Sequence, residues 1–340
     1  MKRSAALNRY LKDGGSLGSL AKRPPKRPAE AAFPCDPASV FETQVAALAK
    51  RLSRIGVRHV VIGISGGLDS ALCLLVAVAA FDRLGLDRAG VHAVTMPGFG
   101  TSRRTKGNAD GLCDGLGVAL ETIGIAKSCR QHLKDIGHDG HTPDVTFENA
   151  QARIRTLILM DKANMVGGIV LGTGDLSEIA LGWCTYNGDH MSMFAVNNGV
   201  PKTVVRKVCS WWAGTKAAGT PGERQAAAAI LDIVATPVSP ELVKGQVTED
   251  RIGPYDLHDF FIWNFVVNGL DRRELESAAK RFFKGVYAPE LIRSTLATFL
   301  RRLVTQAFKR NCQPDGIRVF GFDFSPGSWA IPSDLPPDIL

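Results

Sequence analysis

Short apolar runs alternate with longer amphipathic stretches through the first half of the chain. The run at 57–64 is rich in β-branched residues, which is typical of a buried strand, and the stretch 69–84 repeats apolar residues at helical spacing. The same two patterns predict further strands at 89–96, 118–123 and 168–172 and further helices at 40–55, 103–116, 125–135 and 147–165. Because strands that alternate with helices form parallel sheets covered on both faces, we predict an α/β fold with a doubly wound parallel sheet.

The second half of the chain has a different pattern. Beyond about residue 200 the apolar spacing is mainly helical, which predicts helices added C-terminal to the sheet. The segment 237–254 is polar and is interrupted by Pro and Gly, so we expect a mobile loop there.

Basic residues are concentrated at the N-terminus. The formal net charge is +8, and residues 1–30 contain eight Lys or Arg against two acidic residues, which leaves +2 for the remainder. Residues 22–34 are rich in Pro and basic residues, so we expect residues 1–35 to form a disordered leader and residues 36–340 to form the folded domain. Nucleic-acid contact and organelle targeting are the alternatives for the leader, but the nearly balanced remainder gives no reason to expect a nucleic-acid partner.

Length and composition narrow the class of protein. A chain of 340 residues, 45% of them hydrophobic, can bury a sizeable core. It contains no uncharged apolar run of about 18 residues, so we expect no membrane span. The seven cysteines are scattered and include no C-x-x-C pair, which favours reduced thiols in a cytoplasmic enzyme over disulfides or a zinc site.

The stretch "SGGLDS" lies between the first predicted strand and the following helix. Backbone N–H groups at such a helix start have no helical partner, and Gly66 and Gly67 allow a bulky anion to approach them. No lysine follows the glycines, so the stretch is not a G-x-x-x-x-G-K-[ST] phosphate loop. The plain alternative is a Gly-rich turn in which Asp69 only favours the helix dipole. The combination of residues instead favours an anion site, with Asp69 as a Mg²⁺ ligand.

A second block, at 167–194, repeats the arrangement of strand, tight turn and helix. Asp175 and Glu178 are three residues apart, which is the spacing of a helix capping box as well as of two carboxylates on one face. The downstream Trp183, Tyr186 and Asp189 favour a binding site over a simple cap. Because ligands of parallel sheets bind at the carboxyl ends of the strands, we expect segments 65–70, 97–104 and 173–190 to meet at one site.

Six stretches, in order, resemble one family: "IGISGGLDS", "MPGFGTS", "DVTFENAQARIRT", "VLGTGDLSEIALGWCTYNGDHMSMF", "NNGVPKT" and "FKR". "SGGLDS" alone is similar to the signature of the ATP pyrophosphatases, which have the adenine nucleotide α-hydrolase fold. Together the stretches resemble the synthetase domain of glutamine-dependent NAD synthetase, from about Asp36 to about Asp334.

The resemblance implies an activity and a set of site residues. The family converts nicotinate adenine dinucleotide, ATP and ammonia into NAD, AMP and pyrophosphate through an adenylate. Mg²⁺ would be held by Asp69 and Glu178, and we expect Asp175 to accept a proton from ammonia. ATP would contact Gly63, Ile64, Ser65, Gly66, Gly67, Leu68, Asp69, Ser70, Thr173, Lys202 and Ser239. The dinucleotide would contact Asn149, Arg153, Glu178, Trp183, Cys184, Thr185, Tyr186, Asp189 and Lys309.

The resemblance also implies a homodimer with the dinucleotide site near its interface, and two departures qualify it. Family members of this type usually carry an N-terminal glutaminase domain, whereas Cys35 here lies in a Pro-rich linker and is not a glutaminase nucleophile. Free ammonia, a separate glutaminase subunit or a missing domain must therefore supply nitrogen. The family's Asp-Trp-Arg before "PSD" is replaced by Ser328-Trp329-Ala330. Another adenylating enzyme of this fold and a non-catalytic nucleotide-binding subunit are the alternative functions.

Overall fold

A parallel sheet forms the centre of the N-terminal half, as the sequence predicts. The computed structural model describes residues 5–22, 24–239, 242, 247–337 and 339–340. Its sheet has the strand order β3-β2-β1-β4-β5, and all the pairings are parallel. The strands are β1 (Val60–Gly63), β2 (Val91–Thr95), β3 (Leu120–Thr122), β4 (Ile169–Gly172) and β5 (Phe194–Ala195). The chain runs outward from β1 to β2 and β3 and then returns to β4 on the other side of β1, so the switch point lies between β1 and β4.

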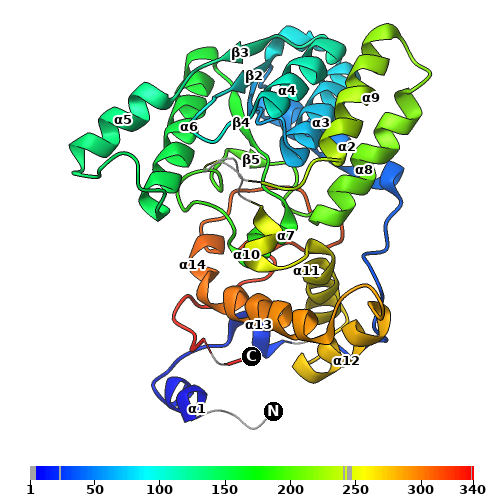
Figure 1. The fold of residues 1–340 in the computed structure, drawn as a ribbon. Helices are drawn as coiled ribbons and strands as arrows, with labels where there is room; N and C mark the ends of the chain where they lie inside the picture. The colour runs from blue at the N-terminus through cyan, green and yellow to red at the C-terminus, as the bar shows by residue number, and fades with distance from the viewer. Residues whose placement is uncertain (1–4, 23, 240–241, 243–246, 338) are drawn as a thin grey trace.

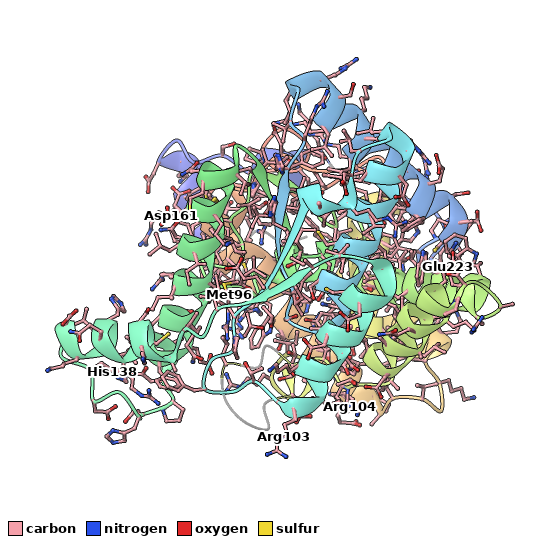
Figure 2. All side chains as sticks on the ribbon, turned by 90° about the horizontal axis from the view of Figure 1, so that it is seen from above. Met96, Arg103, Arg104, His138, Asp161 and Glu223 are labelled. Atoms are coloured by element: carbon pink, nitrogen blue, oxygen red, sulfur yellow. The ribbon has the colours of Figure 1, made fainter. Side chains whose placement is uncertain are left out.

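Helices cover both faces of the sheet, because successive strand residues point to opposite sides. Val61 lies in a core with residues of α5 (Ala126–Asp135) and α6 (Val145–Val166), whereas Val60 and Ile62 lie in the main core with α2 (Pro37–Ile55), α3 (Leu68–Leu84) and α4 (Arg103–Leu116). Seen from above, α6 and α9 (Pro221–Val234) lie on opposite sides of the sheet, with Met96 between them (Figure 2). The predicted doubly wound arrangement is confirmed.

The predicted helix ends agree closely with the structure, because local signals set them. Asp36, Ser102 and Asp144 cap the first turns of α2, α4 and α6 with their side chains. Gly56 and Gly117 end α2 and α4 in the left-handed conformation that glycine adopts without strain.

The C-terminal half adds a helical layer below the sheet (Figure 1). The prediction of mainly helical structure beyond about residue 200 is confirmed by α8 (Lys202–Lys216), α9, α10 (Thr248–Ile252), α11 (Tyr255–Ile262), a π-helical turn at Trp263–Val267, α12 (Arg272–Phe282), α13 (Pro289–Thr305) and α14 (Ala307–Arg310). The short helix α7 (Leu176–Leu181) precedes this region and follows β4. Of the mobile loop expected at 237–254, residues 240–241 and 243–246 lie outside the described residues, and Thr248–Ile252 is helix rather than loop. Among the described helices, none combines the length and the apolar character that crossing a bilayer requires.

The N-terminal leader differs from its expected disorder in the residues that the structure describes. It contains α1 (Ala5–Lys12) and a short 3₁₀ helix (Gly18–Ala21), and it runs along the C-terminal helices (Figure 1). Leu20 and Phe33 are buried, and the Phe33 ring lies 4.9 Å from that of Trp263.

Hydrogen bonds to backbone groups attach the leader to the C-terminal helical layer. Ser19 N–H donates to the carbonyl of Ala330, and Ala330 N–H donates to Ser19 Oγ. Asn264 exchanges hydrogen bonds with the backbone of Glu30. The composition of the leader predicts disorder because few of its residues are apolar, but those few dock on a surface formed elsewhere in the chain. The unusual Ala330 lies at this contact.

We expect Leu20→Ala to lower the free energy of unfolding by about 2 kcal/mol, because a buried leucine side chain is lost from a packed contact. Leu231→Ala is the matched control, since Leu231 is 52% exposed and its truncation removes little packing. Urea unfolding measures both variants. Equal stabilities would mean that the leader is detached in solution.

Candidate active site

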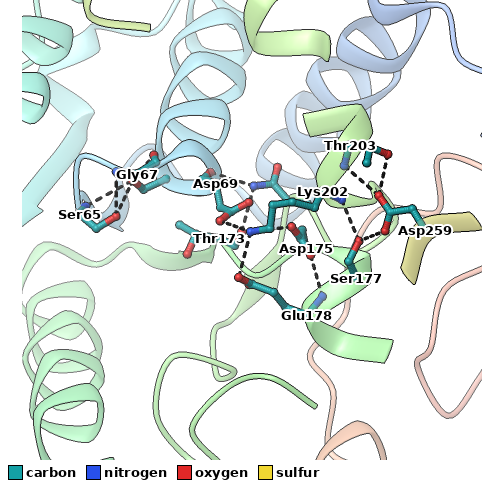
Figure 3. Close-up of polar contacts among 12 residues, drawn as sticks. Ser65, Gly67, Asp69, Thr173, Asp175, Ser177, Glu178, Lys202, Thr203 and Asp259 are labelled. Atoms are coloured by element: carbon teal, nitrogen blue, oxygen red, sulfur yellow. Dashed lines mark hydrogen bonds and ion pairs between the residues drawn. The ribbon is translucent and has the colours of Figure 1, made fainter. Parts of the chain in front are cut away.

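The predicted phosphate loop follows β1 and is shaped by its own hydroxyl groups. Gly67 N–H donates to Ser65 Oγ, and Ser70 Oγ donates to the carbonyl of Gly67 (Figure 3). These bonds fold the backbone across the start of α3, where helical N–H groups have no partner in the helix. The loop is therefore held in place by its own side chains, at a helix start of the kind that can bind an anion.

Gly66 sits where no other residue fits. Its φ is +78°, and a Cβ atom at this position would lie 2.0 Å from the carbonyl oxygen of Thr105 in α4. The close approach of loop and helix explains why "SGGLDS" needs its first glycine.

Three carboxylates from two helices converge on one ammonium group at the bottom of the site. Lys202 Nζ lies 2.6 Å from Asp69 Oδ2, 2.8 Å from Asp175 Oδ2 and 2.9 Å from Glu178 Oε1 (Figure 3). Asp69 lies in the first turn of α3, Lys202 begins α8, and Asp175 caps α7 by accepting a hydrogen bond from Glu178 N–H. Asp175 is thus a helix cap, as the local pattern allows, but the Glu178 side chain is bonded to Lys202.

Burial and attraction oppose each other in this cluster. Burial raises the pKa of Asp175 well above its usual value and the pKa of Glu178 to about 7, while Lys202 opposes both shifts. Burial alone would lower the pKa of Lys202, but the three carboxylates raise it well above its usual value. The ammonium therefore stays charged, and it makes the close approach of the carboxylates tolerable.

A second set of hydrogen bonds holds the backbone around the cluster. Asp259 of α11 accepts hydrogen bonds from Ser177 Oγ and from the N–H and Oγ of Thr203, and Ser177 Oγ accepts one from Lys202 N–H. Asn197 Nδ2 donates to the carbonyls of Asp69 and Thr173, so it ties the phosphate loop to the turn after β4. These hydrogen bonds consequently join the ends of β1 and β4 to four helices, α3, α7, α8 and α11.

A cavity of about 790 Å³ lies above this cluster, at the carboxyl ends of β1 and β4. Its wall includes all the residues that the sequence assigns to the dinucleotide and all those that it assigns to ATP except Lys202. Asp175, the expected proton acceptor, does not line it either. Lys202 is 1% exposed and Asp175 is fully buried, so both lie behind the cavity wall. Asp175 is therefore poorly placed to take a proton from ammonia, contrary to the expectation from the sequence.

Polar contacts order the opposite end of the cavity, where the dinucleotide is expected. Thr185 Oγ1 donates to Asn149 Oδ1 and Thr185 N–H donates to Asp189 Oδ1, while Arg153 Nε donates to the carbonyl of Tyr186. Lys309 Nζ donates to the carbonyls of Gly182 and Cys184. The two predicted substrate regions therefore share one cavity.

Sequence reasoning missed several residues of this wall. Arg302 of α13 lies over the ring of Trp183, 5.1 Å from its centre, and donates to the carbonyl of Leu181. Thr105 and Gln306 also line the cavity. These residues have no local signature, and only the folded chain brings them to the site. Asn197, which ties the phosphate loop to the turn after β4, was also missed. Its sequence signal was the pair of asparagines in "NNGVPKT".

The carboxylates suit a hard divalent cation. Ligand atoms of Asp69, Asp175 and Glu178 lie within 4.8 Å of one another, and carboxylate oxygens are the ligands that Mg²⁺ prefers. Among the described residues, none donates a hydrogen bond to the buried Asp69 Oδ1, so this atom is available as a ligand. The residues present therefore fit the expected Mg²⁺ site at Asp69 and Glu178.

A parallel sheet with a Gly-rich loop after its central strand, and with carboxylates beside that loop, is an α/β fold of the ATP pyrophosphatase type. The family model for NAD synthase matches residues 40–282, and the chain belongs to this family.

Comparisons with particular proteins agree with this assignment. The chain is 39% identical over 325 residues to the glutamine-dependent NAD(+) synthetase of Mycobacterium leprae, covering 87% of this chain and 47% of that protein. It spans about half the length of the curated relatives it matches.

Solved structures share the fold. A glutamine-dependent NAD(+) synthetase from Cytophaga hutchinsonii matches with a TM-score of 0.69 at 17% identity, over 88% of this chain and 54% of that one. An NH3-dependent NAD synthetase from Campylobacter jejuni matches with a TM-score of 0.52 at 22% identity, over 81% and 96% of the two chains. At these identities the likeness concerns the fold alone.

Gly66→Ala should lower the free energy of unfolding by about 2–4 kcal/mol, since a left-handed backbone and a clash with α4 combine. It should also weaken binding of a fluorescent ATP analogue. Gly107→Ala, on the exposed face of α4 with open space around its Cβ, is the matched control and should raise stability by about 1 kcal/mol. Urea unfolding and analogue titration check both, and similar behaviour of the two variants would refute the account of the loop.

Proposed function

We propose that this chain catalyses the ATP-dependent amidation of nicotinate adenine dinucleotide, giving NAD, AMP and pyrophosphate, with ammonia as nitrogen donor. The observation that supports this proposal most directly is that one cavity is lined by the phosphate loop, by the carboxylates and by the aromatic loop at 183–186. An adenylating enzyme must bring the α-phosphate of ATP to the substrate carboxylate, so one shared cavity supports this reaction.

The reaction makes a poor electrophile reactive. A carboxylate resists attack because of its charge and because oxide is a very poor leaving group. When the nicotinate carboxylate attacks the α-phosphorus of ATP, pyrophosphate leaves and an acyl-adenylate forms. Ammonia then attacks the acyl carbon, AMP departs, and the amide of NAD remains.

The chain's own groups have distinct tasks in this proposal. The backbone N–H groups at 65–70 bind the departing pyrophosphate, helped by the start of α3. Thr173 and Ser239, also on the cavity wall, contact ATP. Mg²⁺, held by Asp69 and Glu178, would neutralise phosphate charge when bound.

The other end of the cavity receives the dinucleotide. The flat nicotinate ring lies among Trp183 to Tyr186, and Asn149, Arg153 and Lys309 contact the rest of the molecule. Asp189 is the carboxylate better placed than Asp175 to take the proton that ammonia loses. It lines this part of the cavity with an exposed carboxylate, and Thr185 N–H donates to its Oδ1 and orients it.

We propose free ammonia as the donor for this chain, although the curated relatives are glutamine-dependent and about twice as long. Glutamine hydrolysis requires an activated nucleophile, usually a cysteine beside a base. Cys73, Cys184 and Cys209 are unsuited, because burial raises the pKa of each thiol far above its usual value. A glutaminase domain or subunit that acts with this chain would deliver ammonia to the same cavity. The free cysteines support a cytoplasmic location.

The purified chain should make NAD from ATP, Mg²⁺, nicotinate adenine dinucleotide and ammonium chloride, and it should make almost none from ammonia-free glutamine. The rate should rise with pH, because only neutral ammonia attacks. NAD and glutamate are measured together. Equal NAD yield from glutamine, with glutamate formed in step, would contradict the proposal. Cys312→Ala would then test the one thiol that lies near a histidine nitrogen, 3.7 Å from His190 Nε2.

We also propose a homodimer that forms through the outer face of α6. Leu157 is 60% exposed and Met165 is 82% exposed on this helix, so a partner that covers them would remove apolar surface from water. Arg153, one turn before Leu157, lines the cavity, so a partner on this face would lie beside the dinucleotide site.

Sedimentation should show a dimer that Leu157→Glu dissociates, because a charge is then buried in the contact. Leu231→Glu is the control, since Leu231 is 52% exposed on α9, across the sheet from α6. A monomeric wild type, or a dimer that persists in Leu157→Glu, would refute this interface.

A further inference from the structure

Lys202 occupies the point at which the three carboxylates converge. Its ammonium group contacts one oxygen each of Asp69, Asp175 and Glu178, at 2.6–2.9 Å. A metal ion that used these oxygens would need the same point. Mg²⁺ takes its oxygen ligands at about 2.1 Å, so its opposite ligands lie about 4.2 Å apart, and one carboxylate oxygen from each of the three residues lies within 4.8 Å of the other two.

The stem of Lys202 is fixed, and its ammonium group lies behind the wall of the cavity. The backbone N–H donates to Ser177 Oγ, and Thr203 is bonded to Asp259, so the start of α8 is anchored. The ring of Tyr255 lies 5.3 Å from Nζ on one side. Asp69 and Glu178 contact the ammonium and also line the cavity, so the ammonium lies directly behind these two carboxylates.

The charges do not allow both cations at this point. An ammonium and a divalent cation that share the oxygens of Asp69 and Glu178 would lie only a few ångströms apart with like charge and little water between them. An ion that takes the oxygens contacted by Lys202 must therefore displace the ammonium from at least one of them. The cluster without metal has a formal charge of −2, from three carboxylates and one ammonium, and it still attracts a cation that can displace the lysine.

We propose that Lys202 is a built-in competitor for the metal site. It holds the carboxylates in the nucleotide-free protein and resists free divalent cations, and it yields when the metal arrives with the phosphates of a nucleotide, to which the ammonium then turns. The inference rests on the proposed function only in that the nucleotide is ATP. It predicts that metal and nucleotide bind together and that metal alone binds weakly.

Titration with Mn²⁺ alone, followed by electron paramagnetic resonance, tests the competition without turnover. Lys202→Met keeps the length of the side chain and removes its charge, so Mn²⁺ should bind about tenfold more tightly than to the wild type. Asp69→Asn in the same background should abolish the gain, which shows that the ion sits at this site. Unchanged or weaker Mn²⁺ binding to Lys202→Met would overturn the proposal and leave Lys202 as a permanent counter-ion.

The double variant Lys202→Met/Asp175→Asn tests whether Lys202 weakens metal binding by occupying the site or only through its charge. Its cluster has the same formal charge of −2 as the wild type, and it remains usable if Lys202→Met alone fails to fold. Tighter Mn²⁺ binding than in the wild type supports competition for the site, whereas wild-type affinity would mean that charge alone governs binding and would overturn it. Because no NAD is measured, failure of the proposed reaction would leave this result unaffected.

Discussion

The ion cluster of Lys202 with Asp69, Asp175 and Glu178 is the constraint on which the site depends. It joins the starts of α3, α7 and α8, which follow different strands of the sheet. Removing one partner from such a buried cluster leaves charge without compensation, a loss of about 3–5 kcal/mol in comparable cases. The geometry of the loop at 65–70 and of the three carboxylates is therefore fixed together.

The surroundings of the cluster show how the fold supports these charges. Gln44 Nε2, from α2, donates to Asn197 Oδ1, and Asn197 in turn holds the backbone of both Asp69 and Thr173. Asp259 plays the matching part on the other side, through Ser177 and Thr203. Its burial raises its pKa to about 6, so it is ionised at neutral pH and accepts these bonds. These hydrogen bonds therefore hold the backbone at the switch point between β1 and β4, which forms the bottom of the cavity.

The sequence predicts those parts of the molecule that local patterns determine. Four strands, the helices between them, the phosphate loop and the aromatic loop at 183–186 all follow from apolar spacing, glycines and caps. β5 (Phe194–Ala195) was not predicted, because two residues give no periodicity. The burial of Lys202 was not predicted either, since it depends on carboxylates 24 and 133 positions away in the chain. For the same reason composition could not reveal that Leu20 and Phe33 dock on distant helices.

The central claim is that the substrate carboxylate is activated as an adenylate in this cavity. Nicotinate adenine dinucleotide labelled with ¹⁸O in its carboxylate tests it most directly, when turned over with ATP, Mg²⁺ and ammonia. The account predicts that one labelled oxygen appears in the phosphate of AMP, because that oxygen bridges to the α-phosphorus and leaves with it. AMP without label, or ADP and inorganic phosphate as the products, would contradict it.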